Sequence, residues 1–253
     1  MERLAERIYT NLIAEGRYKL FINGIGVTLS VSFFAVLIGT FIGLFVALAR
    51  LFLPDTINNI KKRNQDQRGY KKVVKDIFVI FPLKAIVKLC SAYIDIIRGT
   101  PSYIQILIFN FVIFAGFMKV AFQAGCVAFG VNSGAYVAEI IRAGIQSVDR
   151  GQMEAGRSLG FSSGATLRLI ILPQAVRNIL PPLANEFIVL VKETAIIGYI
   201  GIQDLAKAAS IITSRTFDQA VPLFAVALLY FIVIKILSIL FSQLEKLMSK
   251  ADY

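Results

Sequence analysis

The sequence contains no histidine, only two cysteines and little charge, and each shortage excludes a class of function. Without histidine there is no Ser-His-Asp triad, no histidine metal site and no HExxH zinc motif. Cys90 and Cys126 lie in apolar segments without CxxC spacing, so we expect two buried thiols rather than a disulfide. The chain also lacks the GxxxxGK(S/T) phosphate loop, so it cannot cradle ATP by itself. We therefore expect no catalytic residue, no metal and no cofactor in this chain.

Long apolar runs dominate what is present. The 253 residues are 57% hydrophobic and 17% charged, which is less charge than a soluble domain of this length carries. Residues 20–49 contain no charged side chain, and a membrane-spanning helix needs only about 20 residues. These features predict an all-α integral membrane protein with about five transmembrane helices. We expect the helices at about residues 20–50, 86–118, 120–147, 183–203 and 219–244.

The net charge of +11 would suggest a nucleic acid partner in a soluble chain, but it does not do so here. Lys and Arg lie between apolar spans rather than on a soluble domain, so no nucleic acid partner is expected. With five spans, most basic residues fall in segments 50–88 and 142–177 and near the C-terminus. The positive-inside rule then places the N-terminus outside and the C-terminus in the cytoplasm. Residues 54–76 are expected to form a basic cytoplasmic insertion, a solvated loop near anionic lipid headgroups.

Glycine and proline mark two features of the spans. Gly24-x-x-x-Thr28 and Gly39-x-x-x-Gly43 place small residues four apart, which lets helices approach closely in lipid. RGTP at residues 98–101 should break the second span, and its freed carbonyls need protein or a water-filled cavity around them.

A polar stretch, residues 149–177, interrupts the apolar pattern on the expected cytoplasmic side. Its residues 154–173 read EAGRSLGFSSGATLRLIILP. We expect Asp149 to act as a cap or turn before a short helix, with Glu154 early in that helix. Gly160 would let the chain turn with positive φ, and Pro173 would end or kink a second helix.

The spacing of this stretch resembles the "EAA" cytoplasmic loop of permeases of ATP-binding-cassette (ABC) importers. The resemblance rests on Glu154-Ala155-Gly156, then Gly160, then Ile170-x-Leu172-Pro173. It implies that the loop docks into a groove of a separate ATPase chain. The implied coupling residues are Glu154, Ala155, Gly156, Leu159 and Gly160. Gly156 stands where the family usually has alanine, and we expect it to keep a small residue there for docking.

Two further motifs make the resemblance more specific. RGTP with Gln105 after it, and AYVAE at residues 135–139, are similar to motifs of polar amino acid permeases of the ABC class. From about Gly24 to the C-terminus the chain resembles these arginine, histidine and glutamine permeases, which have the type I importer fold. The family implies one transmembrane permease domain over residues 1–253 in the bacterial plasma (inner) membrane. It also implies partners: a second permease chain (a homodimer or a paralogue), two copies of an ATPase that binds ATP and Mg²⁺, and an extracellular solute-binding protein.

Polar side chains inside the expected spans are the candidates for substrate contact, because such groups at membrane depth face a bundle interior or an aqueous path. Motif position and this pattern select Thr100, Gln105, Glu139, Asn185 and Glu186. Glu186 would suit a cationic ligand such as the side chain of arginine or lysine. Glu139 shares a helix face with Arg142, and the pair is either purely structural or part of the path.

The expected function is ATP-driven uptake of polar amino acids, with cationic ones (arginine, lysine or histidine) favoured. Neutral or acidic amino acids, such as glutamine, cystine or glutamate, are an alternative within the class. An ion-coupled carrier or channel that uses Glu139, Glu186 and Lys192 is an alternative of another class, and the EAA-like loop argues against it. An intramembrane enzyme is disfavoured because the spans offer neither histidine nor a convincing Ser/Lys or paired-Asp arrangement.

Overall fold

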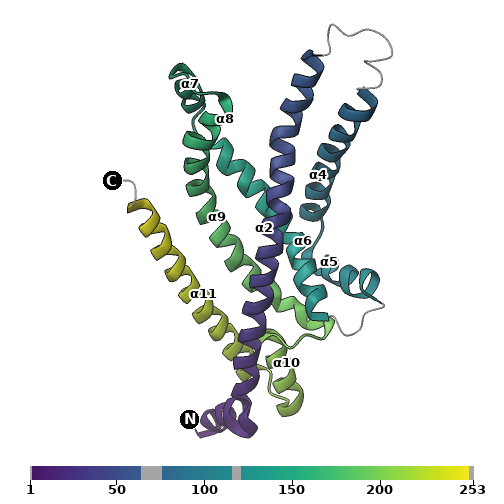
Figure 1. Ribbon diagram of the computed structural model, residues 1–253. Helices are drawn as coiled ribbons and strands as arrows, with labels where there is room; N and C mark the ends of the chain where they lie inside the picture. The colour runs from purple at the N-terminus through teal and green to yellow at the C-terminus, as the bar shows by residue number, and fades with distance from the viewer. Residues whose placement is uncertain (1, 64–75, 116–120, 251–253) are drawn as a thin grey trace. The chain divides into compact units, whose positions relative to one another are not determined.

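The computed structural model describes residues 2–63, 76–115 and 121–250, and every regular element in these ranges is helical (Figure 1). The all-α fold expected from the sequence is therefore confirmed. The elements are α1 (Glu2–Ile8), η1 (Tyr9–Ile13), η2 (Ala14–Gly16), α2 (Tyr18–Arg63), η3 (Asp76–Ile80), α4 (Phe81–Gly99), α5 (Ser102–Ile108), η4 (Phe109–Ile113), α6 (Ala121–Gln146), α7 (Arg150–Ser158), α8 (Ser163–Thr166), η5 (Leu167–Ile171), α9 (Leu172–Glu193), η6 (Thr194–Ile200), α10 (Leu205–Thr216) and α11 (Ala220–Lys250).

Within these residues, three helices are long and apolar enough to cross a membrane: Tyr18–Lys62, Ala121–Gln146 and Ala220–Met248. A fourth candidate is the pair Ser163–Ile200 and Leu205–Thr216, which is bent by 47° at the break between them. The stretch Ser102–Ile113 is apolar but shorter.

The span expected at 86–118 is two helices rather than one. α4 ends at Gly99, Thr100 is extended (φ −124°, ψ 148°), and α5 begins at Ser102. The break has a simple cause, because the ring of Pro101 disfavours helical backbone in the residue before it. The helix break expected from RGTP is therefore present.

Three other expectations at helix boundaries were wrong. α2 continues to Arg63 with Pro54 inside it, so the first part of the insertion expected as a loop is helical; residues 64–75 lie outside the described residues. α9 begins at Leu172 rather than near 183, and it contains the Pro181-Pro182 pair. Pro173 does not end a helix, because it lies inside the continuous helix Ser163–Ile200, directly after the π-helical turn η5. A proline inside a helix removes one backbone hydrogen bond, and the π-helical turn directly before Pro173 is a local distortion of that kind rather than a helix end.

The helices form two compact units that alternate along the sequence. The first unit comprises residues 1–38, 102–130 and 180–253, and the second comprises residues 39–101 and 131–179. α2, α6 and α9 each contribute one part to either unit.

The apolar core of the first unit joins α2, α5, α6, α9 and η6. Its fully buried side chains include Val31, Phe129, Leu190 and Ile197. Cys126 also lies in this core, and Cys90 of the second unit is buried as well. Both thiols are free, as the sequence predicted.

Small residues of α2 allow close helix contacts in both units. A Cβ atom on Gly24 would lie 2.7 Å from the Cα of Leu205 and 2.9 Å from the carbonyl oxygen of Asp204. The buried hydroxyl of Thr28 accepts a hydrogen bond from the Leu205 amide at 3.3 Å, so α2 also helps to cap α10.

In the second unit, Gly39 and Gly43 allow the same kind of close contact between helices. Cβ atoms there would lie 2.9 Å from the Cβ of Ser133 and 2.7 Å from the Cβ of Val137, both on α6. Both small-residue pairs that the sequence assigned to helix packing are therefore confirmed.

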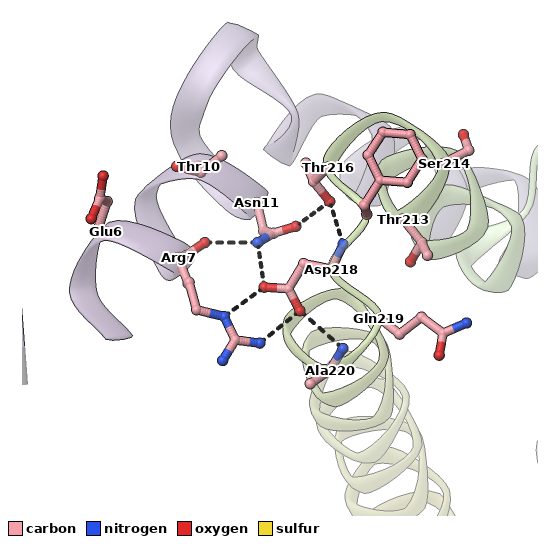
Figure 2. Close-up of a pocket in the computed structure, with 11 residues that line it drawn as sticks. Glu6, Arg7, Thr10, Asn11, Thr213, Ser214, Thr216, Asp218, Gln219 and Ala220 are labelled. Carbon is pink, nitrogen blue, oxygen red and sulfur yellow. Dashed lines mark hydrogen bonds and ion pairs between the residues drawn. The ribbon is translucent and has the colours of Figure 1, made fainter. Parts of the chain in front are cut away.

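Polar contacts hold the N-terminal helices against the turn between α10 and α11 (Figure 2). Two nitrogens of Arg7 donate to the carboxylate of Asp218 at 2.8 Å, and this pairing lowers the pKa of Asp218 to about 2. The buried Asn11 donates to that carboxylate at 3.0 Å and accepts from the Thr216 hydroxyl at 2.8 Å. The exposed Phe217 has φ +55° in this turn, and an open cavity of about 890 Å³ lies beside it.

The close contact at Gly24 yields a test with an internal control two residues away. Gly24→Ala should destabilise the protein by about 1–3 kcal/mol, because the new methyl group meets backbone atoms of residues 204 and 205, which cannot move aside. Gly26→Ala, in the same helix and with open space around it, should be neutral or stabilising by up to about 1 kcal/mol. Thermal unfolding in detergent measures both, and equal melting temperatures for the two variants would contradict this packing.

Candidate functional site

The polar stretch expected at 149–177 begins with a short, well-capped helix in the second unit. The carboxylate of Asp149 accepts a hydrogen bond from the Gly151 amide at 2.6 Å and caps the N-terminus of α7, as predicted. Gly160 ends the helix with φ +88°, and its amide donates to the carbonyl of Arg157 at 3.0 Å. Glu154 is the fifth of the nine residues of α7, so it lies mid-helix rather than early in it as expected.

Gly156 sets the distance between α7 and the helix that follows. It is buried, and a Cβ atom there would lie 2.4 Å from the Cγ2 of Thr166 and 3.2 Å from the Cδ1 of Ile170. The hydroxyl of Ser162 caps α8 by accepting from the Ala165 amide at 3.2 Å. The small residue at 156 therefore serves packing inside the loop. That it is also kept small for docking stays a prediction.

The other four predicted coupling residues are exposed. Glu154, Ala155, Leu159 and Gly160 lie on the surface, and the side chain of Leu159 is 77% exposed. Below it, Val148, Ile171 and Ala175 form a small core that ties the loop to α6 and α9.

A second constellation of the same unit centres on Glu139 of α6. Its carboxylate accepts hydrogen bonds from Arg50 of α2, at 2.5 Å, and from two nitrogens of Arg142, at 3.0 and 2.7 Å. A nitrogen of Arg98, in the last turn of α4, lies 4.0 Å from the same carboxylate. One carboxylate therefore faces guanidinium groups from three helices, and the Glu139–Arg142 pair expected from the sequence is present.

The sequence did not indicate that Arg50 and Arg98 would join this cluster. One signal for Arg50 was available in the sequence. This arginine directly follows a long uncharged run and lies inside the same helix, where a charged side chain needs a partner. Arg98 was noted only as part of the RGTP motif. Neither position reveals a partner, because contact between α2, α4 and α6 depends on how the helices pack.

The predicted substrate residues are divided between the two units. Thr100 and Glu139 belong to the second unit, where the exposed hydroxyl of Thr100 donates to the carbonyl of Ile96 at 2.8 Å. Gln105, Asn185 and Glu186 belong to the first unit.

Within the first unit, the three predicted residues differ in exposure. Gln105 on α5 and Glu186 on α9 are buried, whereas Asn185 is exposed. Neighbouring residues in a helix point about 100° apart, so Asn185 and Glu186 do not share surroundings. That these residues form one substrate site stays a prediction.

These features define a multi-pass helical membrane protein with an exposed, rigid polar loop between two of its apolar helices. Residues 77–250 match the family described as "Binding-protein-dependent transport system inner membrane component". The chain belongs to this family, and it is an amino-acid ABC transporter permease.

Individual relatives agree with this assignment. A Rickettsia felis protein that carries the name of a glutamine transport system permease protein, GlnP, is 37% identical over 229 residues, which cover 90% of this chain and 92% of the relative. The arginine transport system permease protein ArtQ of Bacillus subtilis is 35% identical over 182 residues, which cover 71% and 83%. A crystal structure of an amino acid ABC transporter with histidines matches with a TM-score of 0.74 and 42% identity, over 90% of this chain and 94% of that one.

The cluster around Glu139 predicts a stability effect. Glu139→Gln should destabilise the protein by about 1–3 kcal/mol, because it leaves two hydrogen-bonded guanidinium groups without their counter-charge. Glu154→Gln, the same change on an exposed side chain, should have almost no effect. The melting temperatures of the two purified variants measure this, and equal values would remove Glu139 as a stabilising centre.

The contact between Gly156 and Thr166 predicts a local effect. Gly156→Ala should loosen α7 from α8, because the β-branched Thr166 cannot turn its methyl group away freely. Hydrogen exchange of the amides in residues 150–171 should become faster. Gly164→Ala, which meets no atom within 4 Å, is the matched control. Unchanged exchange in the Gly156 variant would show that the loop accommodates alanine.

Proposed function

We propose that this permease forms the membrane path of an ATP-driven importer and that it favours cationic amino acids. The observation that carries this proposal is the buried carboxylate of Glu186 on α9. An ionisable group at membrane depth is costly and is retained where it meets a partner or a substrate path. A carboxylate there attracts a guanidinium or ammonium group through charge-assisted hydrogen bonds.

The energy for transport comes from a separate chain in this proposal. The α7 loop docks on an ATPase through Glu154, Ala155, Leu159 and Gly160, and ATP with Mg²⁺ binds on that partner. No cofactor binds in this chain. The exposed Leu159 and the capping of α7 support the docking, because a rigid helix transmits motion between chains without first having to become ordered.

The orientation follows from the same assignment. The loop lies in the cytoplasm, the N-terminus lies outside and the C-terminus lies in the cytoplasm of a bacterial cell. The exposed arginines of the loop support this side, because cytoplasmic segments of membrane proteins collect basic residues. They are Arg150, Arg157, Arg168 and Arg177.

The assembly has more chains than this one. We propose two permease chains, identical or paralogous, two ATPase copies and an extracellular solute-binding protein. The family description names dependence on a binding protein, and this supports that partner.

A neutral substrate is the second candidate. Relatives of similar identity carry the names of glutamine and of arginine permeases, which supports both substrates equally. The two candidates differ in what they require of Glu186, because only a cationic side chain needs its charge.

Uptake by proteoliposomes tests this proposal. They carry the permease, its ATPase and its binding protein, and radiolabelled arginine, glutamine and glutamate are compared with and without ATP. We expect arginine uptake that needs ATP and the ATPase. Glu186→Gln should lower it about tenfold or more, through loss of a charged hydrogen bond, and should leave any glutamine uptake unchanged. Glu245→Gln on α11 is the matched control.

The other outcomes separate the alternatives. A preference for glutamine or glutamate would keep the importer and discard the cationic substrate. Uptake without the ATPase would support an ion-coupled carrier. Full arginine uptake by a normally expressed Glu186→Gln variant would remove Glu186 from the site.

A further inference from the structure

The guanidinium group of Arg98 is partly exposed and lies beside the Glu139 carboxylate. Among the described residues its five N–H donors make no hydrogen bond: Glu139 lies 4.0 Å away, and the Tyr136 ring centre lies 5.4 Å from the guanidinium carbon. Asp95, one turn earlier on α4, makes no ion pair with it among these residues. The side chain is 45% exposed, so a ligand can reach it.

The charges around Arg98 do not balance. Arg50, Arg98 and Arg142 face the single carboxylate of Glu139, and Arg50 and Arg142 already occupy that carboxylate with hydrogen bonds. These four groups together carry an excess of two positive charges. Arg98 makes no hydrogen bond among the described residues, so an anion would bind to Arg98 rather than to Arg50 or Arg142.

The cluster lies within the length of a candidate membrane-spanning helix, Ala121–Gln146. Glu139 is seven residues before the end of α6 at Gln146, which is about 10 Å along the helix, and about 27 Å from its start at Ala121. A guanidinium group at this depth faces a bundle interior or an aqueous path rather than lipid alone. For an amino-acid permease the relevant path is that of the substrate.

We propose that Arg98 binds the α-carboxylate of the transported amino acid. A guanidinium fork matches a carboxylate in a bidentate pair, and a point-charge ammonium does not. The Tyr136 ring, within cation–π distance, holds the guanidinium in place. The proposal rests on the amino-acid permease assignment and not on the substrate's side chain, because arginine and glutamine share the α-carboxylate.

The test measures binding to the purified permease–ATPase complex in nanodiscs without the binding protein, so that the selectivity of that protein does not enter. Arginine is compared with argininamide, and glutamine with glutaminamide, by calorimetry. We expect each free acid to bind about 10 to 100 times more tightly than its amide. Arg98→Gln should abolish this preference and leave the affinity for the amides unchanged.

Two variants keep the result interpretable. Arg98→Lys retains the charge but not the fork, and it should recover only part of the preference for the acid. Lys235→Gln removes the same charge from an exposed position on α11 and should leave the preference intact. Each variant is compared by its melting temperature, so that a folding defect is recognised.

Several outcomes would overturn the proposal. These are a full acid-over-amide preference in Arg98→Gln, an equal loss for acid and amide, or no binding of either free acid to the wild-type complex. A lipid phosphate on Arg98 would appear instead as a preference that changes between phosphatidylcholine and phosphatidylglycerol nanodiscs, and as loss of co-purified anionic lipid in Arg98→Gln. The cationic proposal for Glu186 fails separately, through the side-chain preference in the uptake experiment.

Discussion

The need to satisfy charge inside an apolar environment is the constraint on which this structure depends. Lipid provides no hydrophobic drive between helices, so they are held by close packing of small residues and by polar contacts. In the second unit Glu139 meets this need by accepting hydrogen bonds from α2 and from its own helix, with a guanidinium of α4 nearby. In the first unit the Asp218 carboxylate joins the N-terminal helices to the turn before α11, there through an ion pair with Arg7 that water can reach.

The loop around α7 is stabilised in a different way, by capping of its helix ends. Its helices are short, and short helices are marginal in water unless their ends are capped. Asp149 and Ser162 cap their beginnings, Gly160 ends α7, and Gly156 lets α7 contact Thr166 directly. The result is a capped surface element that presents an exposed leucine, Leu159.

Particular residues show where sequence reasoning succeeded. The cap at Asp149, the positive φ at Gly160, the break at Pro101 and the contacts of Gly24 and Gly43 were all predictable, because each depends on local backbone chemistry or on residue size. The start of the basic insertion and Pro173 were misjudged: α2 continues through Pro54 to Arg63, and the helix that contains Pro173 does not end there, since a helix can run past a proline when the lost hydrogen bond is tolerated. The membership of Arg50 and Arg98 in the Glu139 cluster was not predictable, since it joins residues 50, 98 and 139, which are far apart in the chain.

The sequence by itself determined the class of protein. Uncharged runs longer than a bilayer requires and the spacing of residues 154–173 were sufficient to predict a membrane permease of the ABC class. Only the tertiary structure decided which charges meet, that Gly156 is buried while Leu159 is exposed, and that Arg98 makes no hydrogen bond within the described part of the chain. The physical reason is that hydropathy and local propensity act within a few residues of the chain, whereas pairing of charges is settled by which helix faces come into contact.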